Sequence, residues 1–328
     1  MSHASLNDPF GRRIDYLRLS VTDRCDLRCG YCLPKGFKGF EEPAHWLTFD
    51  EIERVVAAFT ALGVRRVRLT GGEPLMRRGL TELAARLSAL PGLDDLSLSS
   101  NATQLESLAV PLARAGVRRL NVSLDSLNPE VFRRITGGDL ERVLRGIAAA
   151  QDVGLDPIRV NTVVMRGVND AEIEDILDYC AAQGFTLRLI ETMPMGATGQ
   201  AAASAFGDLE PIKQRLEQRF ELIPDILPGG GPARYYRVAG TDTRLGFITP
   251  ISQHFCATCN RVRLSVDGTL YLCLGQDHRY PLRDLLRAGI DAAQLQAHLC
   301  QAMALKPERH EFNDRPEQVV RFMSMTGG

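Results

Sequence analysis

The sequence predicts an α/β fold built on a parallel sheet, because strand-like segments alternate with helical ones along the chain. The strand-like segments are residues 16–22, 64–72, 95–101, 118–126, 158–165 and 186–193. Such an alternation gives right-handed crossovers, either in a doubly wound sheet or in a barrel of fewer than eight strands. In both architectures ligands bind at the carboxyl ends of the strands.

The segments between these strands have helical patterns. Residues 47–63 predict a helix that begins with a capping box of Thr48 and Glu51 and stops at Gly63. Similar patterns occupy residues 79–90, 104–116 and 171–184. Pro111 lies inside one of them and predicts either a kink or a helix that begins there.

Beyond the sixth strand the alternation stops. Residues 195–204 are typical of a loop, and residues 208–220 of a helix. Residues 261–273 predict a β-hairpin that turns at Asp267-Gly268. Two further helical segments and a polar tail follow this hairpin.

The length of 328 residues allows one large domain or two of ordinary size. We expect residues 1–193 to form the parallel unit and residues 194–328 to be an addition packed across it. Lys and Arg number 39 and Asp and Glu 40, for a net charge of −1, which argues against nucleic-acid and membrane partners. The N-terminus has no apolar signal core, and no apolar run approaches about 18 residues. We therefore expect a cytoplasmic protein.

Eight cysteines are present, and in a reducing cytosol clustered cysteines indicate metal binding or catalysis rather than disulfides. Six of them form two triplets: Cys25, Cys29 and Cys32, and Cys256, Cys259 and Cys273. The other two, Cys180 and Cys300, are interpreted as packing residues on helices.

The first triplet offers three thiolates with no histidine close in sequence, whereas structural zinc takes four protein ligands. This shortfall favours a [4Fe–4S] cluster with one open iron over zinc. The second triplet also fits a zinc knuckle, for which His254 or His278 is a candidate fourth ligand. The spacing alone leaves iron–sulfur and zinc both open for the second triplet.

Several predicted strands contain an arginine between apolar neighbours, and two more arginines share one face of the hairpin. They are Arg18, Arg68, Arg159 and Arg188, with Arg261 and Arg263 in the hairpin. If the apolar neighbours pack against outer helices, the arginine side chains lie on the opposite face of the sheet and point into the barrel. Buried positive charge is costly, so we expect a phosphate-bearing ligand there. The alternative is local pairing with Asp125, Glu73 and Glu191.

The motifs together resemble the radical S-adenosylmethionine (SAM) superfamily. Cys-x3-Cys-x2-Cys with Tyr31 before the last cysteine follows the first strand, and Gly71-Gly72-Glu73-Pro74 ends the second. Segments 8–32, 68–78, 121–127, 161–170 and 256–268 and the terminal Gly-Gly further resemble the GTP 3′,8-cyclase (MoaA) family of molybdenum cofactor biosynthesis. This resemblance covers essentially the whole chain.

The resemblance implies a partial six-stranded (β/α) TIM-like barrel with a C-terminal β-hairpin and helical layer. It implies a lyase that uses two [4Fe–4S] clusters and SAM to convert GTP to (8S)-3′,8-cyclo-7,8-dihydro-GTP. Cyclic pyranopterin monophosphate synthase is the downstream partner that it implies, and a flavodoxin- or ferredoxin-type protein the reductant. A homodimer is compatible with it.

The resemblance also implies roles for individual residues. Cys25, Cys29 and Cys32 would bind the first cluster, and Cys256, Cys259 and Cys273 the second. SAM contacts are expected at Tyr31, Gly72, Ser123 and Met193. GTP contacts are expected at Arg18, Arg68, Ser99, Arg159, Arg188, Arg261, Val262 and Arg263. A catalytic contribution is expected from Arg18, Arg261, Arg263, Gly327 and Gly328.

Two departures from the family pattern concern GTP binding. Relatives commonly have TTNG where this chain has Ser99-Ser100-Asn101-Ala102, and lysine where it has Arg159. Serine keeps the hydroxyl and arginine keeps the charge, but the loop glycine and the ammonium geometry are lost. Two alternatives remain from the sequence: a radical SAM enzyme that modifies a peptide, and a zinc-stabilised binding module without catalysis.

Overall fold

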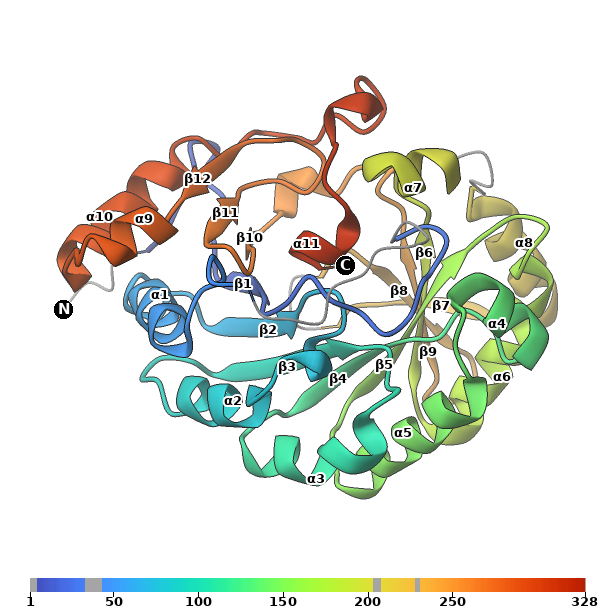
Figure 1. Cartoon of the computed structure of the whole chain (residues 1–328). Helices are drawn as coiled ribbons and strands as arrows, with labels where there is room; N and C mark the ends of the chain where they lie inside the picture. The colour runs from blue at the N-terminus through green and yellow to red at the C-terminus, as the bar shows by residue number, and fades with distance from the viewer. Residues whose placement is uncertain (1–4, 33–42, 203–207, 228–230, 328) are drawn as a thin grey trace.

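The computed structural model describes residues 5–32, 43–202, 208–227 and 231–327. Its centre is one curved, twelve-stranded sheet in the order β12-β11-β10-β1-β2-β3-β4-β5-β6-β9-β8-β7. Helices cover the outer side of the curve, and the last helix, α11, lies on the inner side near β1 (Figure 1). The sheet does not close on itself, so the molecule is an open, partial barrel.

The six predicted strands are all present and form the middle of the sheet. They are β1 (Tyr16–Ser20), β2 (Arg66–Thr70), β3 (Asp95–Ser100), β4 (Arg119–Ser123), β5 (Ile158–Val164) and β6 (Thr186–Glu191). Each pairs in parallel with the next in chain order. A doubly wound sheet reverses its strand order at a switch point, which this sheet does not, so the partial barrel is confirmed.

The strands after the sixth extend this sheet at both edges. They are β7 (Leu222–Asp225), β8 (Arg234–Val238), β9 (Arg244–Ile248), β10 (Arg261–Leu264), β11 (Thr269–Tyr271) and β12 (Arg279–Pro281). β9 pairs in parallel with β6, and β10 pairs in parallel with β1. The predicted hairpin is confirmed as β10 and β11, and Gly268 in its turn has a φ of 84° that favours glycine. Residues far apart in sequence therefore share one inner face.

The helices connect and flank these strands. They are α1 (Phe49–Ala61), α2 (Leu80–Ser88), α3 (Leu105–Arg114), α4 (Pro129–Thr136), α5 (Leu140–Asp152), α6 (Ile173–Gln183), α7 (Gly196–Ala202), α8 (Glu210–Arg219), α9 (Arg283–Arg287), α10 (Ala292–Met303) and α11 (Met323–Thr326). Short 3₁₀ turns are η1 (Pro74–Met76), η2 (Asp170–Glu172), η4 (Cys256–Thr258) and η5 (Pro316–Gln318). The capping box of Thr48 and Glu51 on α1 is confirmed.

Two local predictions need correction. α3 begins at Leu105 and continues through Pro111, so the alternative that a helix begins at that proline is wrong, whereas a kink there stays a prediction. Helix α7 occupies most of the predicted loop 195–204, despite its glycines. Close packing requires glycine at position 199, because a Cβ there would lie 2.6 Å from the Met193 carbonyl oxygen, and Thr198 Oγ1 donates to the Cys32 carbonyl and so ties the helix to the first cysteine loop.

The apolar core lies between the sheet and the outer helices. Leu17, Leu19, Val67 and Leu69 are fully buried in it, and they alternate with arginines on the same strands. Because neighbouring strand residues face opposite sides, the arginine side chains lie on the inner face, as predicted.

The two unclustered cysteines differ from each other. Cys180 on α6 is buried, as predicted, whereas Cys300 is exposed and its prediction as a packing residue was wrong. Leu295, Leu299 and Met303 form the buried side of α10, and Cys300 lies on its other side. None of the helices in the described part of the chain combines the length and apolar composition that crossing a bilayer requires.

An N-terminal ion pair fixes the C-terminal cysteine loop. Arg12 is buried, and its Nε lies 2.5 Å from Asp8 Oδ2. Its terminal nitrogens donate to the carbonyls of Cys256, Pro307 and Glu308 at 2.6–2.8 Å. One guanidinium thus joins the N-terminal residues to the Cys256 loop and to the loop that contains Pro307 and Glu308.

We predict that Arg12→Ala lowers the free energy of unfolding by about 3–5 kcal/mol, because it removes the ion pair of the buried Asp8 carboxylate and leaves three carbonyls without the guanidinium donor. Urea denaturation measures this loss. Arg13→Ala is the matched control, since Arg13 is exposed and should change stability by less than about 0.5 kcal/mol. An equal effect of the two substitutions would contradict the role of Arg12.

Candidate active site

Two adjoining cavities lie on the inner side of the sheet. The first, called the arginine cavity, contains the strand arginines and the second cysteine triplet. The second, called the glycine-turn cavity, contains the first cysteine triplet and the turn at Gly71-Gly72. Asn161, Ile190 and Met193 line both, so a ligand in one cavity lies next to a ligand in the other.

Strand register places the arginines of the first cavity in rows. Arg18 on β1 is directly opposite Arg68 on β2 and Arg263 on β10. Two residues earlier on the same face, Tyr16 is opposite Arg66 and Arg261. Arg159 and Arg188 reach the cavity from β5 and β6. The predicted convergence of these side chains is therefore confirmed.

No ion pair with an acidic residue is present at any of the six predicted arginines within the described ranges. Each has a buried Nε without a hydrogen-bond partner there: Arg18, Arg68, Arg159, Arg188, Arg261 and Arg263. The alternative that local acids neutralise them is wrong. Glu73 accepts from Leu75 N, Ser100 Oγ and Asn101 N, and Glu191 accepts from the loop at Ser252. Asp125 accepts from Tyr31 and Val163.

Burial of these like charges lowers the pKa values of several arginines in the cavity. Burial, with repulsion from Arg261, lowers the pKa of Arg263 to about 9. Burial also lowers the pKa of Arg188 to about 10, and that of Arg18 to well below its usual value. Each shift reflects the cost of confining like charges in low dielectric. An anion with several acceptor oxygens would offset that cost.

One asparagine and one glycine position Arg188. Its guanidinium donates to Asn121 Oδ1. A Cβ on Gly246 would lie 2.8 Å from the Tyr235 ring and 3.1 Å from Arg188 Cγ. The missing side chain at Gly246 therefore gives Arg188 and Tyr235 the space that they occupy.

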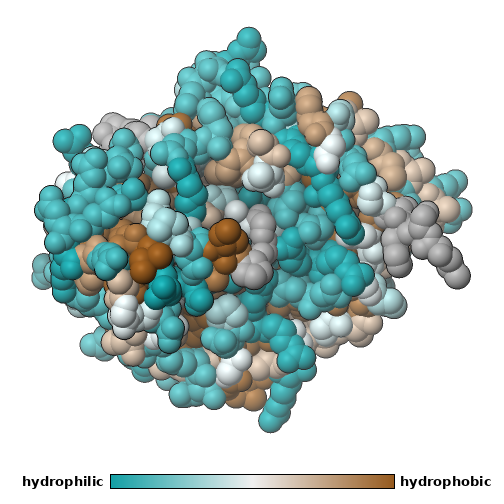
Figure 2. Space-filling model, turned by 180° about the vertical axis from the view of Figure 1, so that it is seen from behind, coloured by the Kyte–Doolittle hydropathy of each residue, from teal (hydrophilic) through white to brown (hydrophobic). Residues whose placement is uncertain are grey.

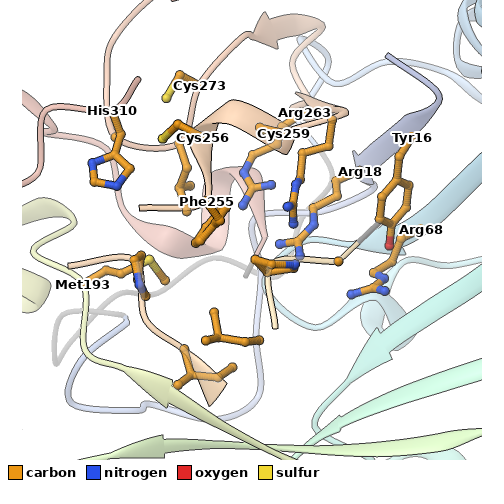
Figure 3. A pocket seen from close by; sticks show the side chains of 18 of the residues that line it. Tyr16, Arg18, Arg68, Met193, Phe255, Cys256, Cys259, Arg263, Cys273 and His310 are labelled. Carbon is orange, nitrogen blue, oxygen red and sulfur yellow. The ribbon is translucent and has the colours of Figure 1, made fainter. Parts of the chain in front are cut away.

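The second cysteine triplet lines the arginine cavity on the side away from Tyr16 and Arg68 (Figure 3). Lys306 is buried beside it, with Nζ 2.5 Å from the Leu272 carbonyl, 3.2 Å from the Arg261 carbonyl and 3.9 Å from Cys259 Sγ. Burial alone would raise the pKa of the Cys259 thiol, but Lys306 and Arg261 lower it to about 7. A positive charge thus faces the thiolate that a metal would bind.

The candidate histidines differ in their surroundings. His254 Nδ1 lies 3.1 Å from Nε2 of His310, and His310 lines the arginine cavity beside Cys256. His278 is exposed. His310 is a site residue that the sequence prediction missed.

The first cysteine triplet lies on the loop after β1 and is hydrogen-bonded to the glycine turn after β2. Gly72 N donates to the Thr22 carbonyl at 2.9 Å, and Glu73 N to the Arg24 carbonyl at 2.7 Å. A Cβ on Gly72 would lie 2.2 Å from the Arg24 carbonyl oxygen. Only glycine permits this approach, which fixes the loop that presents Cys25 and Cys29.

The four residues expected to contact SAM all line the glycine-turn cavity: Tyr31, Gly72, Ser123 and Met193. Tyr31 donates through its hydroxyl to Asp125 Oδ2 at 2.7 Å, an interaction not foreseen from the sequence. Ser99, expected among the GTP contacts, lines this cavity rather than the arginine cavity. The boundary between the two cavities therefore passes close to Ser99.

The spacing of the cysteines can be compared with the spacing that a single zinc ion requires. Among the residues that the structure describes, no group of three or more His, Cys, Asp or Glu side chains converges closely enough to hold a single metal ion. A [4Fe–4S] cluster binds each thiolate to a different iron atom and so suits more widely spaced ligands. The two triplets therefore fit a polynuclear cluster better than mononuclear zinc.

The C-terminal tail enters the mouth of the barrel. Ser324 and Thr326 on α11 are buried, and Met323 lines the glycine-turn cavity. Gly327 has a φ of 69°, and a Cβ there would lie 2.2 Å from Thr70 Oγ1 at the end of β2. Gly328 lies outside the described residues. The described part of the tail is thus packed inside the site (Figure 1).

The sequence prediction missed several other residues of the arginine cavity: Tyr16, Tyr235, Phe255, Lys306 beside it, and His310. Tyr16 was detectable, because it lies two residues before Arg18 on the same strand face. The others come from loops and from β8, whose placement depends on tertiary packing.

Comparison with known families agrees with this arrangement. The model of the radical SAM superfamily matches residues 19–180, and the model Molybdenum Cofactor Synthesis C matches residues 185–312. The chain is 49% identical to the GTP 3′,8-cyclase of Ectopseudomonas mendocina, over 98% of each chain. It is 48% identical to GTP 3′,8-cyclase 2 of Pseudomonas aeruginosa, over 100% of each chain. This chain belongs to the GTP 3′,8-cyclase family.

Solved structures show the same fold at greater distance. Streptococcus suis SuiB bound to S-adenosylmethionine matches this member of the cyclase family with a TM-score of 0.61 and 17% identity, over 85% of this chain and 66% of that one. SuiB bound to precursor peptide SuiA matches with a TM-score of 0.62 and 15% identity, over 94% of this chain and 66% of SuiB. The chain thus spans 66% of SuiB's length, and the likeness concerns the fold alone.

We predict that Gly72→Ala destabilises the protein by about 1–3 kcal/mol, because the new methyl group overlaps the Arg24 carbonyl. Chemical denaturation of the purified protein gives this value. Gly30→Ala in the neighbouring cysteine loop is the matched control, since a Cβ there would meet no atom within 4 Å. If Gly72→Ala were as stable as Gly30→Ala, the close approach would not constrain the loop.

Proposed function

We propose that this chain converts GTP to (8S)-3′,8-cyclo-7,8-dihydro-GTP, the first step of molybdenum cofactor biosynthesis. The observation that supports this most strongly is the row of arginines that have no acidic partner among the described residues, together with the three thiols that line each of the two cavities. Relatives that are 48–49% identical over nearly their whole length are named for this reaction. In reaction class the enzyme is a lyase.

The glycine-turn cavity fits the radical-generating part of the reaction. In the proposal Cys25, Cys29 and Cys32 hold a [4Fe–4S] cluster and leave room for SAM beside Gly72 and Met193. When bound, cluster and SAM supply the radical that removes hydrogen from C3′ of GTP. The protein holds C3′ against SAM and excludes water from the barrel.

The arginine cavity fits the substrate. The guanidinium groups bind the triphosphate through charge-assisted hydrogen bonds, and their rigid rows fix the direction of the phosphate chain. The proposed contacts are Arg18, Arg68, Arg159, Arg188, Arg261, Val262 and Arg263, with Ser99 at the boundary of the cavities. Cys256, Cys259 and Cys273 would hold a second [4Fe–4S] cluster, which the guanine end approaches. Met193 lines both cavities, which suits a position between SAM and the ribose.

The proposal extends to the surroundings of the enzyme. The product would pass to cyclic pyranopterin monophosphate synthase, and a flavodoxin- or ferredoxin-type protein would supply electrons. We propose a cytoplasmic location, with residues 1–193 as the radical-generating unit and 194–328 as the unit that holds the second cluster. Formation of a homodimer is part of the same proposal and is tested by sedimentation.

The experiment that tests the reaction uses GTP carrying deuterium at C3′, with anaerobically reconstituted enzyme, SAM and dithionite. We expect deuterium in the 5′-deoxyadenosine that forms, together with the cyclised nucleotide. Formation of 5′-deoxyadenosine without deuterium, and of no cyclised product, would contradict GTP as the substrate. A zinc-binding module would yield no 5′-deoxyadenosine at all.

The two cysteine triplets should respond differently to substitution. Cys29→Ser removes a ligand of the first cluster and should abolish SAM cleavage. Cys259→Ser should leave about half of the iron and allow uncoupled SAM cleavage, but prevent cyclisation. Iron analysis and chromatography of 5′-deoxyadenosine measure both, and Cys300→Ser is the control because Cys300 is exposed on α10. Full iron content in Cys259→Ser would remove the second cluster from the proposal.

The tail should act in chemistry rather than in folding. Its terminal carboxylate carries a negative charge and would be drawn toward Arg18, Arg261 and Arg263. Deleting Gly327 and Gly328 should leave iron content and the melting temperature nearly unchanged, whereas cyclisation is lost. Turnover of GTP by the truncated enzyme at the wild-type rate would contradict this role.

A further inference from the structure

Tyr16 is a buried residue of the arginine cavity to which the proposed reaction assigns no role. It is the first residue of β1, with 4% of its surface exposed, and it faces the cavity. Its hydroxyl oxygen has no hydrogen-bond partner among the described residues. A buried polar group without a partner is costly, so its retention needs a reason.

Two arginines pack against the Tyr16 ring, of which Arg66 is paired with Asp15 and Arg68 has no acidic partner among the described residues. The Arg68 guanidinium lies 5.4 Å from the ring centroid and that of Arg66 5.6 Å. Burial alone would raise the pKa of the Tyr16 hydroxyl, but Arg68, Arg18 and other arginines lower it below its usual value. The hydroxyl thus lies in a region of strongly positive potential.

These neighbours cannot satisfy the hydroxyl as a donor. Guanidinium groups have five N–H donors and no acceptor, so the Tyr16 proton finds no acceptor on them. The Nε atoms of Arg18, Arg68 and Arg261 are themselves buried without partners. The Tyr16 hydroxyl and the arginine Nε atoms all lack an acceptor within the described residues. A bound anion would supply one, because its oxygens can accept hydrogen bonds from the hydroxyl and from the guanidinium groups together.

The position of Tyr16 in the cavity indicates which part of a bound nucleotide lies near its hydroxyl. Figure 3 shows Tyr16 and Arg68 on one side and Cys256, Cys259 and Cys273 on the other, with Arg18 and Arg263 between them. With the guanine at the cysteine side, the phosphate chain runs past Arg18 and Arg263 toward Tyr16. In this orientation the terminal phosphate of a triphosphate is the part of the ligand nearest to the Tyr16 hydroxyl.

We propose that the Tyr16 hydroxyl donates a hydrogen bond to the terminal phosphate of the nucleotide and so makes the cavity sensitive to the length of the phosphate chain. This inference rests on the proposed function, because it takes GTP as the ligand. It assigns to Tyr16 the discrimination of GTP from GMP, a task distinct from the charge that the arginines provide.

The test compares Tyr16→Phe with the wild type by calorimetric titration of the full chain with GTP and with GMP. Phenylalanine keeps the ring and its packing against Arg66 and Arg68 and removes only the hydroxyl. We expect GTP to bind roughly tenfold more weakly, as for loss of one hydrogen bond to a charged group. Affinity for GMP should change less than about twofold.

Tyr280→Phe is the matched control. Its hydroxyl lies 2.7 Å from His298 Nδ1 in the C-terminal layer, and Tyr280 does not line the arginine cavity. This variant loses a tyrosine hydroxyl elsewhere and should bind GTP as the wild type does. Thermal unfolding of all three proteins verifies that the fold is kept.

The outcomes separate the inference from the proposed function. An unchanged GTP affinity in Tyr16→Phe, or equal losses for GTP and GMP, would overturn the role of Tyr16 while GTP remains the substrate. A wild type that binds GTP no more tightly than guanosine would overturn the proposed triphosphate site itself, and the inference with it. Loss of GTP binding with GMP binding retained supports the inference.

Discussion

The whole arrangement depends on positive charge that the folded chain confines without neutralising it. Six arginines face the inner side of one sheet, and none is paired with an acid in the described part of the chain. Burial, together with repulsion from neighbouring arginines, lowers the pKa of Arg263 and Arg188, because the charged form is disfavoured there. A bound anion would offset the repulsion between these arginines. Because such an anion binds only the folded chain, it should also stabilise the fold.

Sheet pairing explains how two distant cysteine groups come to share this charged interior. β10 pairs in parallel with β1, which places Arg263 beside Arg18 and brings the loops bearing Cys256 and Cys273 to the same cavity. Arg12 fixes the Cys256 loop from the N-terminal side, and the glycine turn fixes the other cysteine loop. The geometry of both cysteine loops thus depends on hydrogen bonds to their backbone carbonyls, from one guanidinium and from the glycine turn.

The six core strands and the capping box of α1 were predictable, because apolar alternation and cap residues act locally. The inward direction of the strand arginines followed from the same alternation. Helix α7 was not predictable, since its glycines oppose helix formation and packing against Met193 overrides them. The extension of the sheet at both edges, and the placement of Lys306 and His310, depend on pairings between distant segments that a single sequence does not specify.

The most direct test of the central claim measures how phosphate alone affects folding stability. Inorganic tripolyphosphate carries the charge of the nucleotide without its base, so it should raise the thermal unfolding midpoint of the full chain, while guanosine should leave it almost unchanged. Sodium sulfate at equal ionic strength serves as the reference for general salt effects. An identical midpoint with tripolyphosphate and with sulfate would contradict an arginine cavity built to bind a phosphate chain.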